Sequence, residues 1–122
     1  MSKAQKKFAV RSKVWIEDAQ GNVVFGMGRY RMLVVIRETG SLNATAKALK
    51  MSYRAVWMRI RTSEERLGKR LVEPDGNGSR LTPFAEQLMA RFEQLKAEVN
   101  RQSDTFFENL FAGAIHDAGP SA

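Results

Sequence analysis

The sequence predicts a mainly α-helical fold with small β elements: a winged helix-turn-helix with an N-terminal β-hairpin and a long C-terminal dimerisation helix. Three patterns support this prediction. Two short helical segments meet at a tight connection around residues 50–52, brief apolar runs flank a turn-rich segment between residues 71 and 82, and an unbroken helical pattern starts at residue 83. A length of 122 residues fits one folded domain, since domains usually have about 100–200 residues.

The chain is strongly basic, and the excess charge is concentrated in one region. Lysine and arginine number 20 against 13 aspartates and glutamates, which gives a net charge of +7. Between residues 47 and 70, eight basic residues stand against two glutamates, so +6 of the +7 lies in this segment. This charge favours an anionic partner such as nucleic acid or a membrane surface, and its position coincides with the helix-turn-helix pattern.

The residue types present argue against an enzyme or a membrane protein. The chain has no cysteine, and its single histidine, His116, lies in a polar tail, so neither a metal site nor a Ser/His/Asp triad is expected. No window approaches the roughly 18 apolar residues of a membrane span, and no apolar run typical of a signal peptide follows the basic N-terminus. We therefore expect a cytoplasmic protein that is not an enzyme and needs no metal or cofactor.

The predicted elements divide the chain into four parts: a flexible basic arm over 1–11, the winged helix-turn-helix domain over 12–82, the long dimerisation helix over 83–111 and a disordered tail over 112–122. Within the domain, β-rich runs at 14–16 and 23–25 around the turn-rich EDAQGN predict a hairpin. The apolar spacing over 29–38 predicts a helix that Gly40 ends.

Capping residues predict the bounds of the two helices that follow. Ser41 is a suitable N-cap for a helix over 42–49, and Ser52 for a helix over 53–67 that ends at Gly68. Two short helices with so short a connection form a helix-turn-helix. The segment RLVEPDGNGSRLT, from residue 70, then predicts a two-stranded wing.

Helical geometry sorts the side chains of the helix over 53–67. At 100° per residue, one stripe faces the core and consists of Val56, Ile60, Ser63 and Leu67. The opposite pole consists of Arg54, Met58, Arg61 and Glu65, and Tyr53 and Trp57 lie on one flank. Glu64 is expected, like Glu65, at the helix surface.

An outward pole of this composition suits DNA. We expect Arg54 and Tyr53 to contact base edges in a major groove, with Trp57 beside them. Phosphate contacts, which set register, are expected from Lys50, Ser52 and Arg61. The alternative is an ordinary solvated face with Trp57 mostly in the core, and for Trp57 this structural role is favoured.

The segments GSLNATAKALKMSYRAVWMRI, EERLGKRLVEP and SRLT, in this order, resemble the winged helix-turn-helix of LysR-type regulators. With the leading KVWIEDAQGNVVFGMGR, they resemble more closely the N-terminal domain of the molybdate-responsive ModE family. The resemblance covers about residues 12–100. It implies a DNA-binding transcriptional regulator that is dimeric through its hairpin and long helices.

Carried over residue by residue, the resemblance places base reading on Ser52, Tyr53, Arg54, Trp57 and Met58. It places the wing over 74–80 near the DNA backbone or minor groove. The full set of expected DNA-binding residues is Ser41, Lys50, Ser52, Tyr53, Arg54, Trp57, Met58, Arg61, Asn77, Ser79 and Arg80.

The chain departs from the family pattern at two points. Ser63 stands where the family usually has leucine, so the core-facing stripe is expected to be looser there or to face a neighbouring helix. The few residues after the last helix are too short for the family's oxyanion-binding domain, so no molybdate-binding domain is expected on this chain.

Thr82 as N-cap and Pro83 as first helical residue open a final helix with apolar heptad spacing. Its length exceeds what a small domain needs, so we expect a homodimer with its interface at Leu88, Phe92, Leu95, Val99 and Phe106. Folding of this helix back on its own chain is the alternative. A homodimer would bind an inverted-repeat operator with half-sites about 10 bp apart or a multiple of that.

Two other functions are compatible with the sequence. The chain could be a protein-interaction or co-regulator module that heterodimerises with another regulator through the hairpin and the segment FFENLF. It could also bind the nucleoid or RNA without sequence preference, through charge alone.

Overall fold

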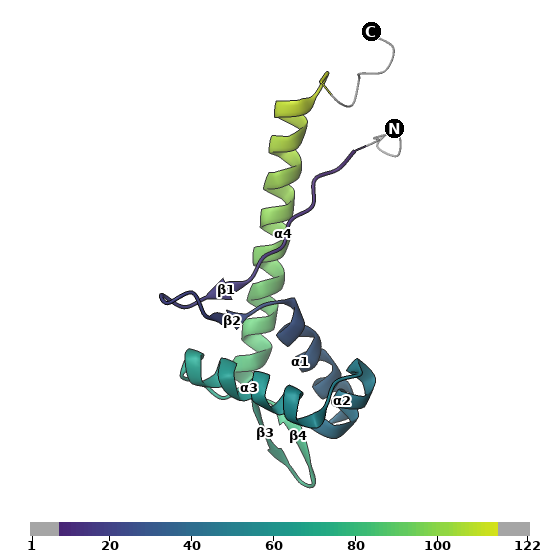
Figure 1. Ribbon diagram of the computed structural model, residues 1–122, viewed down its shortest axis with the longest axis vertical. Coiled ribbons are helices and arrows are strands. Elements are labelled where there is room, and N and C mark those ends of the chain that lie inside the picture. Colours follow the sequence, from purple (N-terminus) through teal and green to yellow (C-terminus); the bar gives the residue numbers. More distant parts are fainter. Residues whose placement is uncertain (1–7, 115–122) are drawn as a thin grey trace. The chain divides into compact units, whose positions relative to one another are not determined.

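The computed structural model describes residues 8–114 and is mainly helical, with two small antiparallel hairpins (Figure 1). Its elements are β1 (Ile16–Glu17), β2 (Val23–Phe25), α1 (Met27–Thr39), α2 (Leu42–Leu49), α3 (Tyr53–Leu67), β3 (Val72–Asp75), β4 (Gly78–Leu81) and α4 (Pro83–Phe111). The predicted fold class, a winged helix-turn-helix with a leading hairpin and a long last helix, is confirmed. None of the described helices is long and apolar enough to cross a membrane.

The chain forms two compact units. One comprises Val14–Phe92 and holds α1 to α3 and both hairpins. The other pairs the described residues up to Lys13 with those from Glu93 onward, and within it the Ser12 hydroxyl donates to Asn100 Oδ1 at 3.3 Å. The predicted basic arm and disordered tail lie largely outside the described residues.

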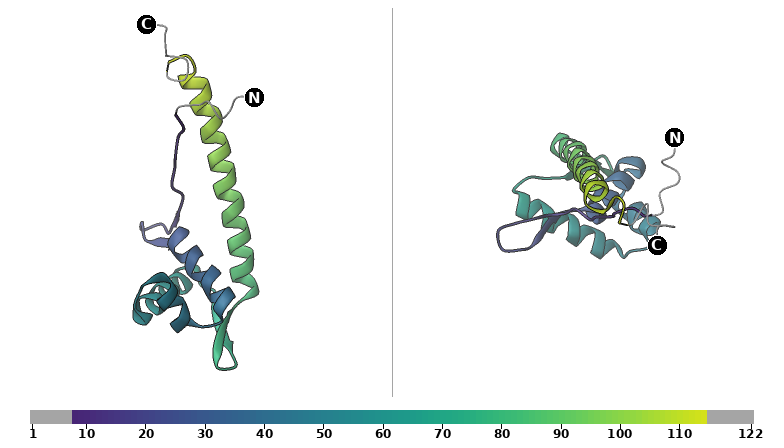
Figure 2. Two further views of the ribbon diagram at one scale, coloured as in Figure 1. Left: turned by 90° about the vertical axis from the view of Figure 1, so that its right-hand side faces the viewer. Right: turned by 90° about the horizontal axis from the view of Figure 1, so that it is seen from above.

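The helix-turn-helix has the bounds that its capping residues predict. The hydroxyls of Ser41 and Ser52 accept hydrogen bonds from the third residue of α2 and of α3, each at 3.0 Å. Gly68 ends α3 in the left-handed conformation, with φ of 70°. α2 packs against both α1 and α3, and Figure 2 shows the three helices together from the side.

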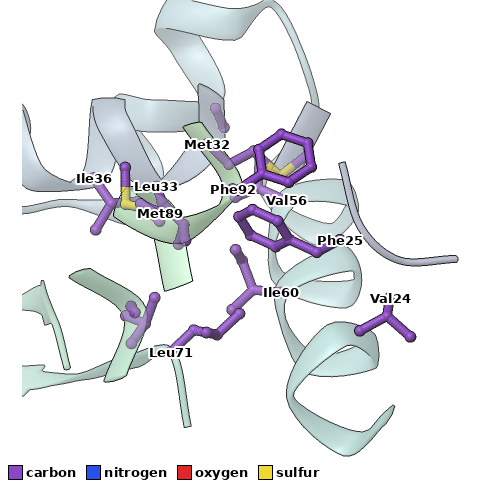
Figure 3. Close-up of a cluster of buried hydrophobic side chains, with 13 residues drawn as sticks. Val24, Phe25, Met32, Leu33, Ile36, Val56, Ile60, Leu71, Met89 and Phe92 are labelled. Carbon is purple, nitrogen blue, oxygen red and sulfur yellow. The ribbon is translucent and has the colours of Figure 1, made fainter. Parts of the chain in front are cut away.

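The core of the Val14–Phe92 unit is a cluster of buried apolar side chains that includes aromatic rings (Figure 3). Phe25 of β2 and Phe92 of α4 meet edge to face, with ring centroids 5.2 Å apart. Val56 and Ile60 of α3 are buried in the same cluster, as the stripe predicts. Each such apolar side chain contributes about 1.5–3 kcal/mol when fully buried, so this cluster holds α3 in place.

One predicted interface residue belongs to this core. Phe92 is 2 % exposed and packs on Phe25 and Tyr30 of its own chain, so its assignment to a dimer interface is wrong. Leu88, one turn earlier, is partly buried against the same core. Heptad spacing could not distinguish core positions from interface positions. The first part of an apolar stripe can pack on its own chain, while the rest of the stripe remains exposed for a partner.

Ser63 joins α3 to the N-terminal hairpin. It is fully buried, and its hydroxyl donates to the carbonyl oxygen of Val24 at 2.7 Å. Arg66, one turn later, donates from Nη1 to the carbonyl of Val23 at 2.5 Å. A leucine could not donate this hydrogen bond, and Ser63 faces a strand of the hairpin rather than a neighbouring helix, the partner expected from the sequence.

The hairpin itself is offset from its prediction. Its first strand covers Ile16–Glu17 rather than 14–16, with an irregular register between those two residues. Val14 packs against the core outside the strand ladder.

The wing is attached to the turn between α1 and α2. Gly40 ends α1 with φ of 67°, and its carbonyl oxygen accepts the backbone N–H of Ser79 at 2.9 Å. Gly78 passes so close that a Cβ built on it would lie 2.3 Å from that oxygen. Only glycine fits there, because a methyl group cannot approach a backbone oxygen so closely.

Replacement of Gly78 by alanine should therefore push the wing away from α1. We expect Gly78→Ala to lower the free energy of unfolding by about 1–3 kcal/mol, the usual cost of overpacking. Urea unfolding followed by circular dichroism measures it. Gly28→Ala is the control, because nothing lies within 4 Å of its added Cβ, and it should be neutral or stabilising. Equal effects of the two variants would contradict this account of the contact.

Candidate nucleic-acid interface

The start of α3 exposes the side chains expected to contact DNA. Arg54 and Met58 are exposed on the side opposite the buried Val56 and Ile60, and Tyr53 is exposed on the flank between them. Within residues 8–114, Arg54 forms no ion pair, and the first turn of α3 has no acidic residue. A free guanidinium thus stands at the positive end of a helix, which is suited to an anion.

Trp57 lies at the surface, so its expected place mostly in the core is wrong. It is 42 % exposed, and the Arg61 guanidinium lies over its ring, 5.5 Å from the centroid. A cation–π contact at an exposed site contributes about 0.5–1 kcal/mol, which restrains both side chains. Trp57 is therefore available for contact on the flank of α3 that faces the wing.

Glu64, expected at the helix surface, is instead buried, with 6 % exposure. Its Oε2 accepts the backbone N–H groups of Leu71 at 2.8 Å and Val72 at 3.1 Å, and the Nε of Arg70 at 3.3 Å. Its Oε1 has no hydrogen-bond partner within the described residues and lies 3.8 Å from Arg61 Nη1. The available signal was its angular position, since Glu64 lies on the same flank as Trp57, next to the apolar stripe.

The wing offers less free positive charge than its sequence suggests. Arg80 pairs across the hairpin with Glu73 at 3.0 Å and lies 3.9 Å from Asp75. The hydrogen bond with Glu73, followed by the charges of both carboxylates, raises the pKa of Arg80. Asn77 is exposed at the tip, and Ser79 is half-buried.

The remaining expected residues cap the two helices of the motif. The hydroxyls of Ser41 and Ser52 serve as N-caps, and Ser52 is exposed. Lys50, also exposed, caps the C-terminus of α2 in the left-handed conformation, with φ of 57°. Lys50 and Ser52 therefore lie next to the start of α3, whereas Ser41 lies at the opposite end of α2.

Helical periodicity places Arg59 and Arg66 on the other flank of α3, but sequence reasoning missed that Arg29 of α1 lies near them. Arg29 of α1 is half-buried, and its Nε has no hydrogen-bond partner within the described residues. Burial, and then the charges of Arg59 and Arg66, lower the pKa of Arg29. Part of the basic excess therefore lies away from the outward pole.

No group of three His, Cys, Asp or Glu side chains that could hold a metal ion occurs in the described part of the chain. The two short helices, the wing and the exposed cationic face together define a winged helix-turn-helix of the DNA-binding class.

Residues 27–86 match the family model of the bacterial regulatory helix-turn-helix proteins of the lysR family. Among curated proteins, the molybdenum transport protein ModE of Azotobacter vinelandii is 31 % identical over 87 residues, which cover 67 % of this chain and 32 % of that protein. The molybdenum-pterin-binding protein MopB of Rhodobacter capsulatus is 30 % identical over 90 residues, covering 70 % and 33 %. This chain thus spans about a third of the length of these relatives.

Solved structures show the same fold. The DNA-binding domain of CbnR, in complex with DNA, matches with a TM-score of 0.55 at 20 % identity, covering 70 % of this chain and 99 % of that one. The DNA-binding domain of BenM, in complex with benA site 1 DNA, matches with a TM-score of 0.53 at 20 % identity, covering 73 % and 99 %. Residues 27–86 are a DNA-binding winged helix-turn-helix domain of the lysR type, and the predicted likeness to ModE regulators is confirmed.

The two possible roles of Ser52, helix cap and phosphate neighbour, can be separated by two substitutions. Ser52→Ala should lower the free energy of unfolding by about 1 kcal/mol, because the cap is lost. Ser52→Asp keeps the cap and should retain stability, but its charge should weaken DNA binding if a phosphate lies nearby. Thermal unfolding and fluorescence anisotropy with a labelled duplex measure the two effects. Wild-type DNA affinity in Ser52→Asp would exclude a phosphate beside Ser52.

Proposed function

We propose that this chain acts as a transcriptional regulator that binds an inverted-repeat operator as a homodimer, with α3 in the major groove and the wing near the backbone or minor groove. The observation that carries the proposal is the joint exposure of Tyr53, Arg54 and Met58 at the capped start of α3. Solved domains of the same fold are described in complex with DNA, which supports the same partner here.

Base reading falls to the first turns of α3 in this proposal. Arg54 can donate two hydrogen bonds to guanine O6 and N7, and Tyr53 lies beside it at the helix start. Lys50 and Ser52, at the turn, and Arg61, farther along the helix, contact phosphates and set the register. Trp57 lies on the wing-side flank next to Arg61.

The second half of α4 supports a homodimer. α4 has 29 residues, a length of about 43 Å, and its buried residues end at Phe92. Leu95, Phe106 and Leu110 are exposed, Phe106 by 60 %, and Val99 is half-buried. The proposed interface therefore keeps Leu95, Val99 and Phe106 from the predicted set and adds Leu110. A second copy of the chain would cover these side chains.

If α3 reads the base sequence, alanine at Arg54 and alanine at Lys50 should change DNA binding in different ways. Arg54→Ala should relax the base preference at one operator position by about 1–3 kcal/mol, whereas Lys50→Ala should weaken binding to all sequences about equally. The operator comes from selection of bound duplexes from a random pool, and binding to it and to single-base variants is then titrated. Equal, sequence-blind losses for both variants would favour charge-only binding.

The oligomeric state tests the interface on α4. Sedimentation at micromolar concentration should show a dimer for the wild type and a monomer for Phe106→Glu, because a carboxylate would be buried without a partner. Thr105→Glu, at the adjacent exposed position, is the control and should remain a dimer. A wild-type monomer both with and without DNA would exclude the homodimer, and a mixed complex with another regulator would favour the co-regulator function.

A further inference from the structure

A hollow of about 190 Å³ lies between α3 and the wing. Trp57 and Arg61 line it from α3, Pro74 and Ser79 line it from the wing, and Arg70 lines it from the segment between them. All of these residues belong to the Val14–Phe92 unit. The hollow is therefore part of one compact body.

The position of this hollow matches the path of a DNA backbone, provided that α3 and the wing bind DNA as in the proposed function. Neighbouring major and minor grooves of a duplex are separated by one sugar–phosphate backbone. If α3 enters the major groove and the wing approaches the adjacent minor groove, that backbone must pass between them. The hollow is the space that these two elements leave for it.

The charges around the hollow suit a phosphate. Arg61 and Arg70 are exposed, and both lie against the Glu64 carboxylate, at 3.8 Å and 3.3 Å. A second hollow of about 210 Å³ shares these three residues and adds Lys69 and Glu65. Three cations thus face two carboxylates here, while Glu73, which also lines the first hollow, is paired with Arg80.

The remaining lining suits a deoxyribose. Trp57, Leu42 and Pro74 supply apolar surface beside the two guanidinium groups. The ring of Trp57 is restrained by Arg61, so the apolar wall and one cation are held together. Alternating sugars and phosphates require this combination of adjacent apolar and cationic surface.

We propose that this hollow binds the sugar–phosphate backbone of the strand that separates the two grooves. Arg61 and Arg70 contact a phosphate, and Trp57 packs on a deoxyribose. Glu64 is a positioning residue, because its Oε2 accepts Arg70 and the N–H groups of Leu71 and Val72 while its Oε1 lies 3.8 Å from the Arg61 guanidinium. Arg70 thereby becomes a DNA contact that the sequence did not indicate.

The salt dependence of DNA binding tests the phosphate contact. The slope of log K against log salt concentration is negative, and its magnitude should fall by about 0.9 for each phosphate contact that is lost. We expect this fall for Arg70→Gln and for Arg61→Gln, measured by anisotropy with the selected operator duplex. Arg91→Gln is the matched control, because Arg91 is exposed on α4 and does not line either hollow. Unchanged slopes in the first two variants would overturn the proposal.

The sugar contact and the role of Glu64 need separate variants. Trp57→Ala should weaken binding to all duplexes severalfold without a change of slope, and unchanged affinity would exclude the sugar contact. Glu64→Gln keeps one oxygen that can accept the two N–H groups but loses the charge. Once circular dichroism shows that this variant is folded, the magnitude of its salt slope should fall as in Arg70→Gln. The double variant Glu64→Gln/Arg70→Gln should show no further fall. An unchanged slope, or tighter binding because a repelling carboxylate is gone, would overturn the positioning role.

The experiments distinguish loss of the backbone site alone from absence of DNA binding. Absence of any wild-type DNA binding would exclude both. Specific wild-type binding that Arg54→Ala relaxes, together with equal slopes for Arg70→Gln and Arg91→Gln, would exclude only the backbone site.

Discussion

The buried carboxylate of Glu64 is the interaction on which the arrangement of α3, wing and α4 depends. A buried charge is tolerated only with partners, and Glu64 finds them in the N–H groups of Leu71 and Val72 and in Arg70. These N–H groups lie at the start of the wing. Thr82, at the end of the wing, returns its N–H to the carbonyl of Leu71 at 3.0 Å and caps α4 through its hydroxyl. The last turn of α3 therefore determines where the wing starts and, through it, where α4 begins.

Local chemistry explains what could be predicted from the sequence. The bounds of α2 and α3 follow from Ser41, Ser52 and Gly68, whose capping roles depend on nearest neighbours along the chain. The outward position of Arg54 and Met58 follows from helical periodicity, which needs only the direction of the core. These features, together with the wing turn, were sufficient for the fold class and for the candidate face at the start of α3.

Tertiary contacts explain what could not be predicted. Whether Phe92 faces its own core or a second chain depends on where Phe25 lies, which the heptad pattern does not contain. Arg80 was expected to bind DNA, but the register of the wing places it opposite Glu73, which pairs with it. Glu64 was expected at the surface because of its charge, and the backbone N–H groups that it binds have no sequence signature; only its angular position next to the apolar stripe indicated burial. In each case the missing information was the partner of a side chain rather than its chemical type.

The backbone conformation of Lys50 lowers the stability of the domain at a position that is proposed to contact DNA. Among residues 8–114 it is the only non-glycine residue with positive φ, a conformation that costs roughly 1–3 kcal/mol for most side chains. Glycine would relieve this strain at the C-cap of α2, but it would remove a cation from the turn that precedes α3. Selection for a more stable domain would therefore draw this position toward glycine, whereas selection for DNA affinity would retain lysine. Under the proposed phosphate contact of Lys50, the strain at this position is a loss of stability that accompanies DNA affinity.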